Sequence, residues 1–211
     1  MAANNKTDFN LETLLTVFKN CRGEDNSLNI DRYNDAYEEL CKLFYLLGKV
    51  FSFVASDVEE KIGILREYRK NDESNHYRTI DSMIQYEVDN KITNNKKKAS
   101  GCRTLLRLHR ALEFTYEFMI EINKADIKDK MSTAASESYG RSLAKFHPFL
   151  IRQAVYLAVH TLPRKELLMK NMNITDEESG KITLEQTIQE MKKVYDITQD
   201  IYTKNKLLDL P

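Results

Sequence analysis

Apolar residues recur along most of this chain at the three- and four-residue spacing of amphipathic helices, and strand-like alternation is scarce. Six glycines and three prolines leave few positions that break helices. We therefore predict an all-α fold. The expected helices cover about 8–21, 30–68 with a break near 48–52, 77–92, 101–123, 132–146, 148–159, 163–172 and 184–202.

Several helix ends carry signals of their own. Asp8 is placed to cap the first helix, ahead of an apolar run that begins with Phe9. Pro148 suits either the first turn of a new helix or a kink in a continuing one. The segment ITDEESGK is expected to be a loop, and residues 1–7 a flexible tail.

The segment GCRTLLRLHRAL, which begins at Gly101, carries an unusual concentration of cations. Arg103, Arg107 and Arg110 lie at i, i+4 and i+7 and so share one side of a helix, above Phe114 and Phe118. The opposite side holds an apolar stripe of Leu105, Leu108, Leu112 and Met119. This arrangement would suit an anion with an apolar tail. From spacing alone, however, a surface helix whose arginines pair with carboxylates is the favoured interpretation.

Two charged residues interrupt another apolar stripe. Val54, Val58, Ile62 and Leu65 recur at helical spacing, and Asp57 and Lys61 fall within the same stripe. Burying such a pair costs several kcal/mol unless it is well satisfied, whereas an ion pair at the edge contributes only ~0.3–0.5 kcal/mol. Without further information, the edge ion pair is the favoured interpretation.

His147 also lies on an apolar face. Leu143, Ile151 and Val155 are at −4, +4 and +8 from it, and a histidine in such a place is more often a core residue than a functional one. His76, His109 and His160 do not complete a metal-ligand spacing with it. We expect no metal, and the chain also lacks phosphate-binding glycine loops and hydrolase motifs, so we expect neither a cofactor nor an enzyme.

Composition narrows the class of protein. With 211 residues and 24.7 kDa, the chain (1–211) is most simply one domain. Lysine plus arginine and aspartate plus glutamate both number 32, which argues against nucleic acid as a partner. Three widely spaced cysteines, no apolar run near the ~20 residues of a membrane span and no signal-peptide pattern favour a cytoplasmic protein.

Taken together, several segments resemble the glycolipid transfer protein superfamily. They are FSFVASDVEEK, GCRTLLRLHRAL, FHPFLIRQAV, TLPRKELLMKNMN and the C-terminal LLDLP. The resemblance runs from Phe9 to Pro211 and is closest to members that carry ceramide-1-phosphate. It implies a two-layer, all-helical sandwich of about eight helices that encloses a lipid-binding cavity.

The resemblance also implies roles for individual residues. Lys61, Arg103 and Arg107 would bind the lipid phosphate. Asp57 would accept a hydrogen bond from the sphingoid amide N–H, and His147 would donate one to the amide carbonyl. The family's sugar-binding members have asparagine and tryptophan where this chain has Lys61 and Arg107, and the chain contains no tryptophan.

Further assignments concern the apolar parts of the lipid and the membrane. Phe149, where the family often has another aromatic residue, would contact the membrane. Arg110 is expected to be structural and paired with a carboxylate, and the alignment leaves open whether Lys97 or Lys98 adds a phosphate contact. The candidate residues of the hydrophobic pocket are Phe9, Leu11, Phe51, Val54, Phe114, Leu143, Ile151 and Val155.

The implied function is transfer of ceramide-1-phosphate between membranes by a monomer. Its membrane contacts would be transient and peripheral, with the Golgi, endosomal, nuclear or plasma membranes as candidates. Two alternatives stay open at this point. The protein could transfer or sense another sphingolipid, such as a glycosphingolipid, or it could be a helical adaptor that keeps the fold without transfer.

Overall fold

The computed structural model describes residues 8–95, 97–174 and 176–211, so the tail predicted at 1–7 lies outside the described residues. Within the described ranges the chain is nearly all helical and contains no strand, as predicted. The elements are α1 (Leu11–Lys19), α2 (Ile30–Leu46), α3 (Lys49–Lys70), α4 (Ile80–Asp89), α5 (Gly101–Lys124), α6 (Met131–Arg141), the 3-10 helix η1 (Leu143–Phe146), α7 (Phe149–Val159), α8 (Lys165–Asn171) and α9 (Glu177–Lys204).

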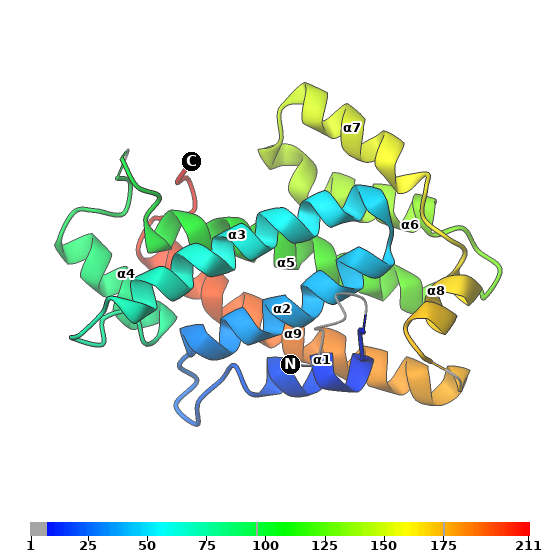
Figure 1. Ribbon diagram of the computed structural model, residues 1–211, viewed down its shortest axis with the longest axis horizontal. Helices are drawn as coiled ribbons and strands as arrows, with labels where there is room; N and C mark the ends of the chain where they lie inside the picture. The colour runs from blue at the N-terminus through cyan, green and yellow to red at the C-terminus, as the bar shows by residue number, and fades with distance from the viewer. Residues whose placement is uncertain (1–7, 96, 175) are drawn as a thin grey trace, which may run out of the picture.

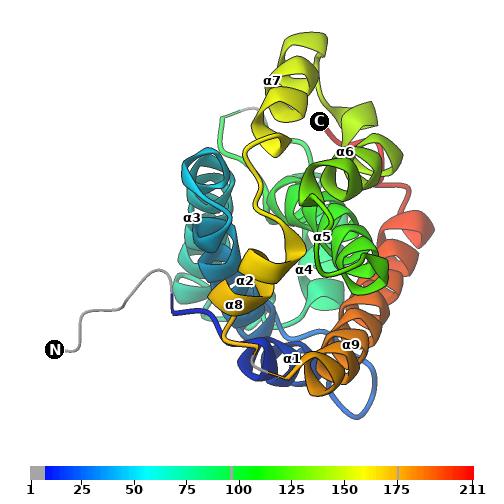
Figure 2. The same cartoon turned by 90° about the vertical axis from the view of Figure 1, so that its right-hand side faces the viewer.

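The long helices form two layers (Figures 1 and 2). In one layer α2 packs along α3 on one side and α1 on the other, and in the second layer α5 lies between α6 and α9. The layers meet where α1 contacts α9 and where α3 contacts α5. Helix α7 packs on α6 and lies at one end of the sandwich. The expected two-layer helical sandwich is thus present.

Local chemistry explains most helix ends, including those that the sequence pattern misplaced. The break predicted near residue 48 is real, because Gly48 has φ 104°, a left-handed conformation that favours glycine. The first helix is capped by Asn10 rather than Asp8, with Asn10 Oδ1 accepting from the Thr13 N–H at 2.8 Å. Pro148 begins a new helix, because its ring removes a donor that a continuing helix would need.

The largest departure from the sequence pattern is at the start of the last helix. Asp176 caps α9 by accepting from the Ser179 N–H at 2.8 Å, so the helix includes most of a segment predicted to be a loop. The apolar pattern begins only at Leu184, about two turns later. A first helical turn held by a side-chain cap and acidic residues needs no apolar face of its own.

The buried apolar side chains of both layers form one cluster. The stripe predicted for α5 is part of it, since Leu105, Leu108, Leu112 and Met119 are all at most 1% exposed. The three cysteines are buried and form no disulfide.

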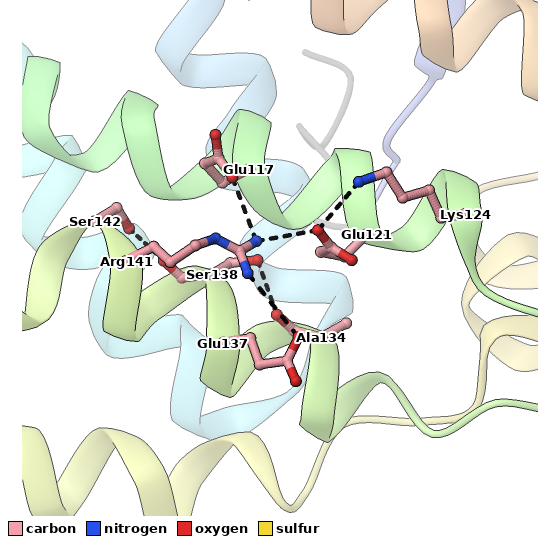
Figure 3. Close-up of polar contacts among 8 residues, drawn as sticks. All are labelled: Glu117, Glu121, Lys124, Ala134, Glu137, Ser138, Arg141 and Ser142. Carbon is pink, nitrogen blue, oxygen red and sulfur yellow. Dashed lines mark hydrogen bonds and ion pairs between the residues drawn. The ribbon is translucent and has the colours of Figure 1, made fainter.

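An ion-pair cluster joins α5 to α6 on the outside of the second layer (Figure 3). Arg141 Nη2 lies 3.0 Å from Glu121 and 3.3 Å from Glu117, and its Nη1 lies 3.9 Å from Glu137. Lys145 in η1 lies 4.0 Å from Glu113, one turn earlier on α5. These contacts keep α6 and η1 against α5, immediately before the chain reaches His147.

Candidate functional site

The first part of the candidate site is a lysine on α3 that the fold covers. The side chain of Lys61 is only 7% exposed, and its Nζ lies 2.5 Å from Asp57 Oδ1 and 3.7 Å from Glu60 Oε2. The Asp57 side chain is 64% exposed. The buried member of the pair is therefore the cation, which needs a nearby anion, while the carboxylate remains accessible.

The arginine helix α5 is held at its N-terminus by a buried carboxylate. Glu87 on α4 is fully buried and accepts hydrogen bonds from the N–H of Gly101 at 2.6 Å, the N–H of Cys102 at 3.0 Å and the hydroxyl of Tyr77 at 3.0 Å. A negative charge at this position also complements the helix dipole. Glu87 thereby positions the turn that carries Arg103.

Sequence reasoning missed Glu87, although a signal was present. Ile80, Met83, Ile84 and Glu87 recur at i, i+3, i+4 and i+7, so this carboxylate interrupts an apolar stripe as Asp57 and Lys61 do. All four side chains are buried in the structure.

The three arginines of α5 have different surroundings. Arg103 donates to main-chain oxygens, from Nη1 to Asn95 at 3.0 Å and from Nε to Pro211 at 3.4 Å. Arg107 is exposed, and neither a hydrogen bond nor an ion pair joins it to any residue that the structure describes. Of the three, Arg107 is therefore the cation most open to an external anion.

Arg110 has a structural role, but its partners differ from those predicted. Its Nη2 donates to the carbonyl oxygens of Leu208 at 2.7 Å and Leu210 at 3.2 Å, and its guanidinium carbon lies 4.0 Å from the centre of the Phe146 ring. Burial and the neighbouring Arg107 lower the pKa of the Arg110 guanidinium. The expected carboxylate partner is thus replaced by main-chain oxygens, which leave no recognisable trace in a sequence.

His147 lies between η1 and α7 and is half-buried. Its Nδ1 is 2.8 Å from the hydroxyl of Tyr139. Burial lowers the pKa of the imidazole, and the carboxylate of Asp57 opposes this effect by raising it. The fold thus brings α3 and the start of α7 close enough for Asp57 and His147 to interact electrostatically, although 90 positions separate them in the sequence.

The candidate pocket residues divide by burial. Phe9, Leu11, Phe51 and Phe114 are at most 7% exposed and belong to the core cluster. Leu143 and Val155 are partly buried and pack against the cluster. Val54 and Ile151 are at the surface, with 39% and 48% of their areas exposed.

Exposed apolar side chains lie close to Asp57 and to His147 in the sequence, on α3 and in the first turn of α7. Phe149, placed at the membrane by resemblance, is 62% exposed, and the neighbouring Leu150 is 78% exposed. Phe53, one turn before Asp57, is 79% exposed. Neither Phe53 nor Leu150 was predicted from the sequence. For α7 a signal existed, because FLIRQAVYLAV is apolar around nearly its whole circumference and still lies at the surface.

Of the two lysines before α5 that the alignment left open, Lys98 already has a carboxylate partner. Lys98 Nζ lies 3.1 Å from Glu67 Oε1 and 4.5 Å from the centre of the Tyr68 ring, and Lys97 is exposed. Among the described residues, His, Cys, Asp and Glu form no group of three or more that could hold a metal ion. In the same part of the chain, each helix is too short or too polar to cross a bilayer.

Comparison with known proteins identifies the family. The family model described as glycolipid transfer protein (GLTP) matches residues 28–174. The chain belongs to the glycolipid transfer protein family. The family and the relatives that this protein matches are lipid transfer proteins rather than enzymes. This agrees with the prediction from sequence that the protein is not an enzyme.

Relatives that match this protein over nearly its full length have a more specific name than the family. The ceramide-1-phosphate transfer protein of Rattus norvegicus is 36% identical over 210 residues, which cover 97% of each chain. The crystal structure of mouse ceramide-1-phosphate transfer protein in its apo-form has 37% identity and a TM-score of 0.92, covering 97% of this chain and 100% of that one. The human protein in complex with 12:0 ceramide-1-phosphate has 34% identity and a TM-score of 0.90, with 96% and 100% coverage.

Proposed function

We propose that this protein transfers ceramide-1-phosphate between membranes. The observation that carries the proposal is the covered cation Lys61, paired with an accessible Asp57 that interacts with His147. Such a group offers a positive charge for a phosphate and, beside it, an acceptor and a donor for an amide. Relatives named for ceramide-1-phosphate transfer, one of them solved with that lipid, support the same conclusion.

The phosphate is the partner of Lys61, Arg103 and Arg107. A phosphate monoester carries about −1.5 to −2 charges at neutral pH and three acceptor oxygens. Each charge-assisted hydrogen bond contributes roughly 1.5–3 kcal/mol, and an arginine can bind two oxygens at once. When the phosphate takes over as the partner of Lys61, the Asp57 carboxylate is released from a contact of 2.5 Å.

The released carboxylate then accepts the N–H of the sphingoid amide, and His147 donates to the amide carbonyl. The resulting site selects lipids in two ways. A sugar head group would leave the cations without an anion, and a choline-capped phosphate has one oxygen fewer and more bulk. A glycerol-based phosphatidic acid has the phosphate but lacks the amide N–H that Asp57 requires.

The hydrocarbon chains enter between the two layers, where the candidate pocket residues named above surround them. Each methylene kept from water saves ~0.8 kcal/mol, which is why a carrier with an apolar interior accelerates exchange. Phe149, together with Phe53 and Leu150, contacts the membrane during loading and release, since all three are exposed and lie close to Asp57 or His147 in the sequence. The protein acts as a single-domain cytoplasmic monomer with transient contacts to Golgi, endosomal, nuclear or plasma membranes.

A head-group-resolved transfer assay tests the proposal. Donor and acceptor vesicles would be supplied in turn with labelled ceramide-1-phosphate, sphingomyelin, glucosylceramide or phosphatidic acid. We expect transfer of ceramide-1-phosphate to exceed that of the others at least tenfold. Equal transfer of all four lipids, or preference for the sugar lipid, would refute the phosphate site. Purified protein that never carries long-chain lipid in mass spectra would favour an adaptor.

Arg107→Leu is the sharpest variant for this assay, because Arg107 has no described partner whose loss would disturb the fold. We expect it to lower ceramide-1-phosphate transfer at least tenfold, in line with roughly 1.5–3 kcal/mol lost from one charge-assisted contact. Arg32→Leu is the matched control, since Arg32 is equally a helical arginine, lies on α2 and is 62% exposed. Arg103→Leu should act in the same direction, and unchanged transfer by both site variants would remove the arginines from the phosphate site.

A further inference from the structure

Tyr139 is a buried residue of α6 whose hydroxyl faces the candidate site. Only 1% of its surface is exposed, and its hydroxyl oxygen lies 2.8 Å from Nδ1 of His147. Its ring is held edge-on by Phe114, with centroids 6.4 Å apart, and by Tyr156, at 5.4 Å. The position of the hydroxyl is therefore determined by packing on both sides of the ring.

The direction of this hydrogen bond follows from a count of donors and acceptors. A phenol has one hydrogen to donate, and leaving it without an acceptor in a buried site costs about 1–3 kcal/mol. Among the described residues, Nδ1 of His147 is the one group in hydrogen-bond contact with the Tyr139 hydroxyl. Arg152 also interacts electrostatically with Tyr139, but a guanidinium has no atom that can accept a hydrogen bond. The hydroxyl therefore donates, and Nδ1 accepts.

The protonation states are consistent with this direction. Burial raises the pKa of the Tyr139 phenol, which keeps its hydrogen in place at neutral pH. Burial also lowers the pKa of His147, more than Asp57 raises it, which favours the neutral imidazole. A neutral imidazole that accepts at Nδ1 carries its single hydrogen on Nε2.

We infer that Tyr139 is a positioning residue that holds His147 in the Nε2–H tautomer and so makes it a hydrogen-bond donor to the lipid. With the opposite tautomer, Nε2 would present a lone pair, which repels an amide carbonyl and instead suits a hydroxyl. Tyr139 thereby acts through His147 and determines which polar group of the lipid His147 recognises. This inference rests on the proposed function for its ligand, but the tautomer itself is a property of the lipid-free protein.

Nitrogen NMR of the imidazoles tests the tautomer directly. In lipid-free protein with ¹⁵N-labelled histidine, the signals of His147 are assigned by their loss in His147→Gln. We expect wild-type His147 to show a protonated Nε2 and an unprotonated Nδ1. Tyr139→Phe, which removes only the hydroxyl, should give a mixture of both tautomers. Tyr156→Phe is the matched control, because it alters the same aromatic cluster without touching Nδ1, and it should leave the wild-type pattern unchanged.

Lipid binding provides the second readout. Tyr139→Phe should weaken ceramide-1-phosphate binding roughly tenfold in the wild-type background, but should have no effect in a His147→Gln background. An equal loss in both backgrounds would mean that Tyr139 acts through packing alone, and would overturn the inference. So would a wild-type spectrum with the hydrogen on Nδ1, or an unchanged tautomer in Tyr139→Phe. Wild-type protein that binds no ceramide-1-phosphate would instead refute the proposed function, while the lipid-free spectra would still decide the tautomer.

Discussion

Lowering the pH toward 5 should destabilise this protein through one buried imidazole, that of His109. The side chain lies between α5 and α9, is 2% exposed and stacks on Tyr195 with ring centroids 4.3 Å apart. Its Nε2 is 2.7 Å from Gln199 Oε1, whereas Nδ1 is buried without a hydrogen-bond partner in the described part of the chain. A proton added at Nδ1 would therefore be buried with no acceptor, close to the positive charge of Arg110.

The size of the effect follows from the two pKa values. Burial, with a smaller contribution from Arg110, lowers the pKa of His109 from 6.5 to about 4 in the folded protein, and the unfolded chain keeps the ordinary value. Above pH 6.5 the imidazole is neutral in both states and has no effect on stability. As the pH falls below 6.5, the unfolded chain binds more protons than the folded one, so the free energy of unfolding decreases. The loss is about 1 kcal/mol at pH 6, about 2 kcal/mol at pH 5 and about 3 kcal/mol at pH 4.

Urea unfolding of wild-type protein and His109→Gln between pH 7 and pH 5 measures this loss. Glutamine keeps a hydrogen-bonding group near Gln199 but does not titrate, and every other histidine is common to both proteins. We expect the variant to be less stable at pH 7, because it loses the stacked ring, and this difference to shrink by about 2 kcal/mol at pH 5. A difference that stays constant within about 0.5 kcal/mol over this range would refute the assignment of the pH effect to His109.

Two further predictions concern how α5 is anchored. Arg110→Leu should lower the free energy of unfolding by about 1–3 kcal/mol, because it removes the hydrogen bonds to the carbonyls of Leu208 and Leu210. Arg107→Leu should leave the melting temperature nearly unchanged, so equal shifts in thermal unfolding would contradict the different roles of the two arginines. Glu87→Gln should cost about 1–3 kcal/mol, because one amide oxygen cannot replace two carboxylate oxygens that accept from three donors. Amide hydrogen exchange should then rise in the first turn of α5, and unchanged protection at Gly101 and Cys102 would show that Glu87 does not hold this helix end.

The helical class and most element positions were readable from sequence because they depend on short-range information. Apolar residues three and four positions apart must share a face of a helix, and this predicted the buried stripe of α5 correctly. The break at Gly48 was readable for a similar reason, since a left-handed residue is a local property. The errors at the starts of α1 and α9 came from side-chain caps, where several polar residues compete and only the folded chain selects one.

The ion pair between Asp57 and Lys61 was predicted from their spacing, but which member is buried was not. Two residues four positions apart on a helix contact each other regardless of their surroundings. Their exposure, in contrast, depends on the helices packed around α3. Spacing also grouped Arg103, Arg107 and Arg110 as equivalent. The structure separates them, because main-chain oxygens of Asn95, Leu208, Leu210 and Pro211 engage two of the three and leave Arg107 without a described partner.

By itself, then, the sequence determined a helical protein, the apolar faces that form its core and the charged residues that interrupt those faces. Only the tertiary structure decided which of these charges remain available to a ligand, and which nitrogen of His147 forms the hydrogen bond with Tyr139. The physical reason is that periodicity is a property of neighbouring residues, whereas the Asp57 and His147 interaction spans 90 positions. Carbonyl oxygens, which every residue carries, have no sequence signature until the fold brings them to a donor.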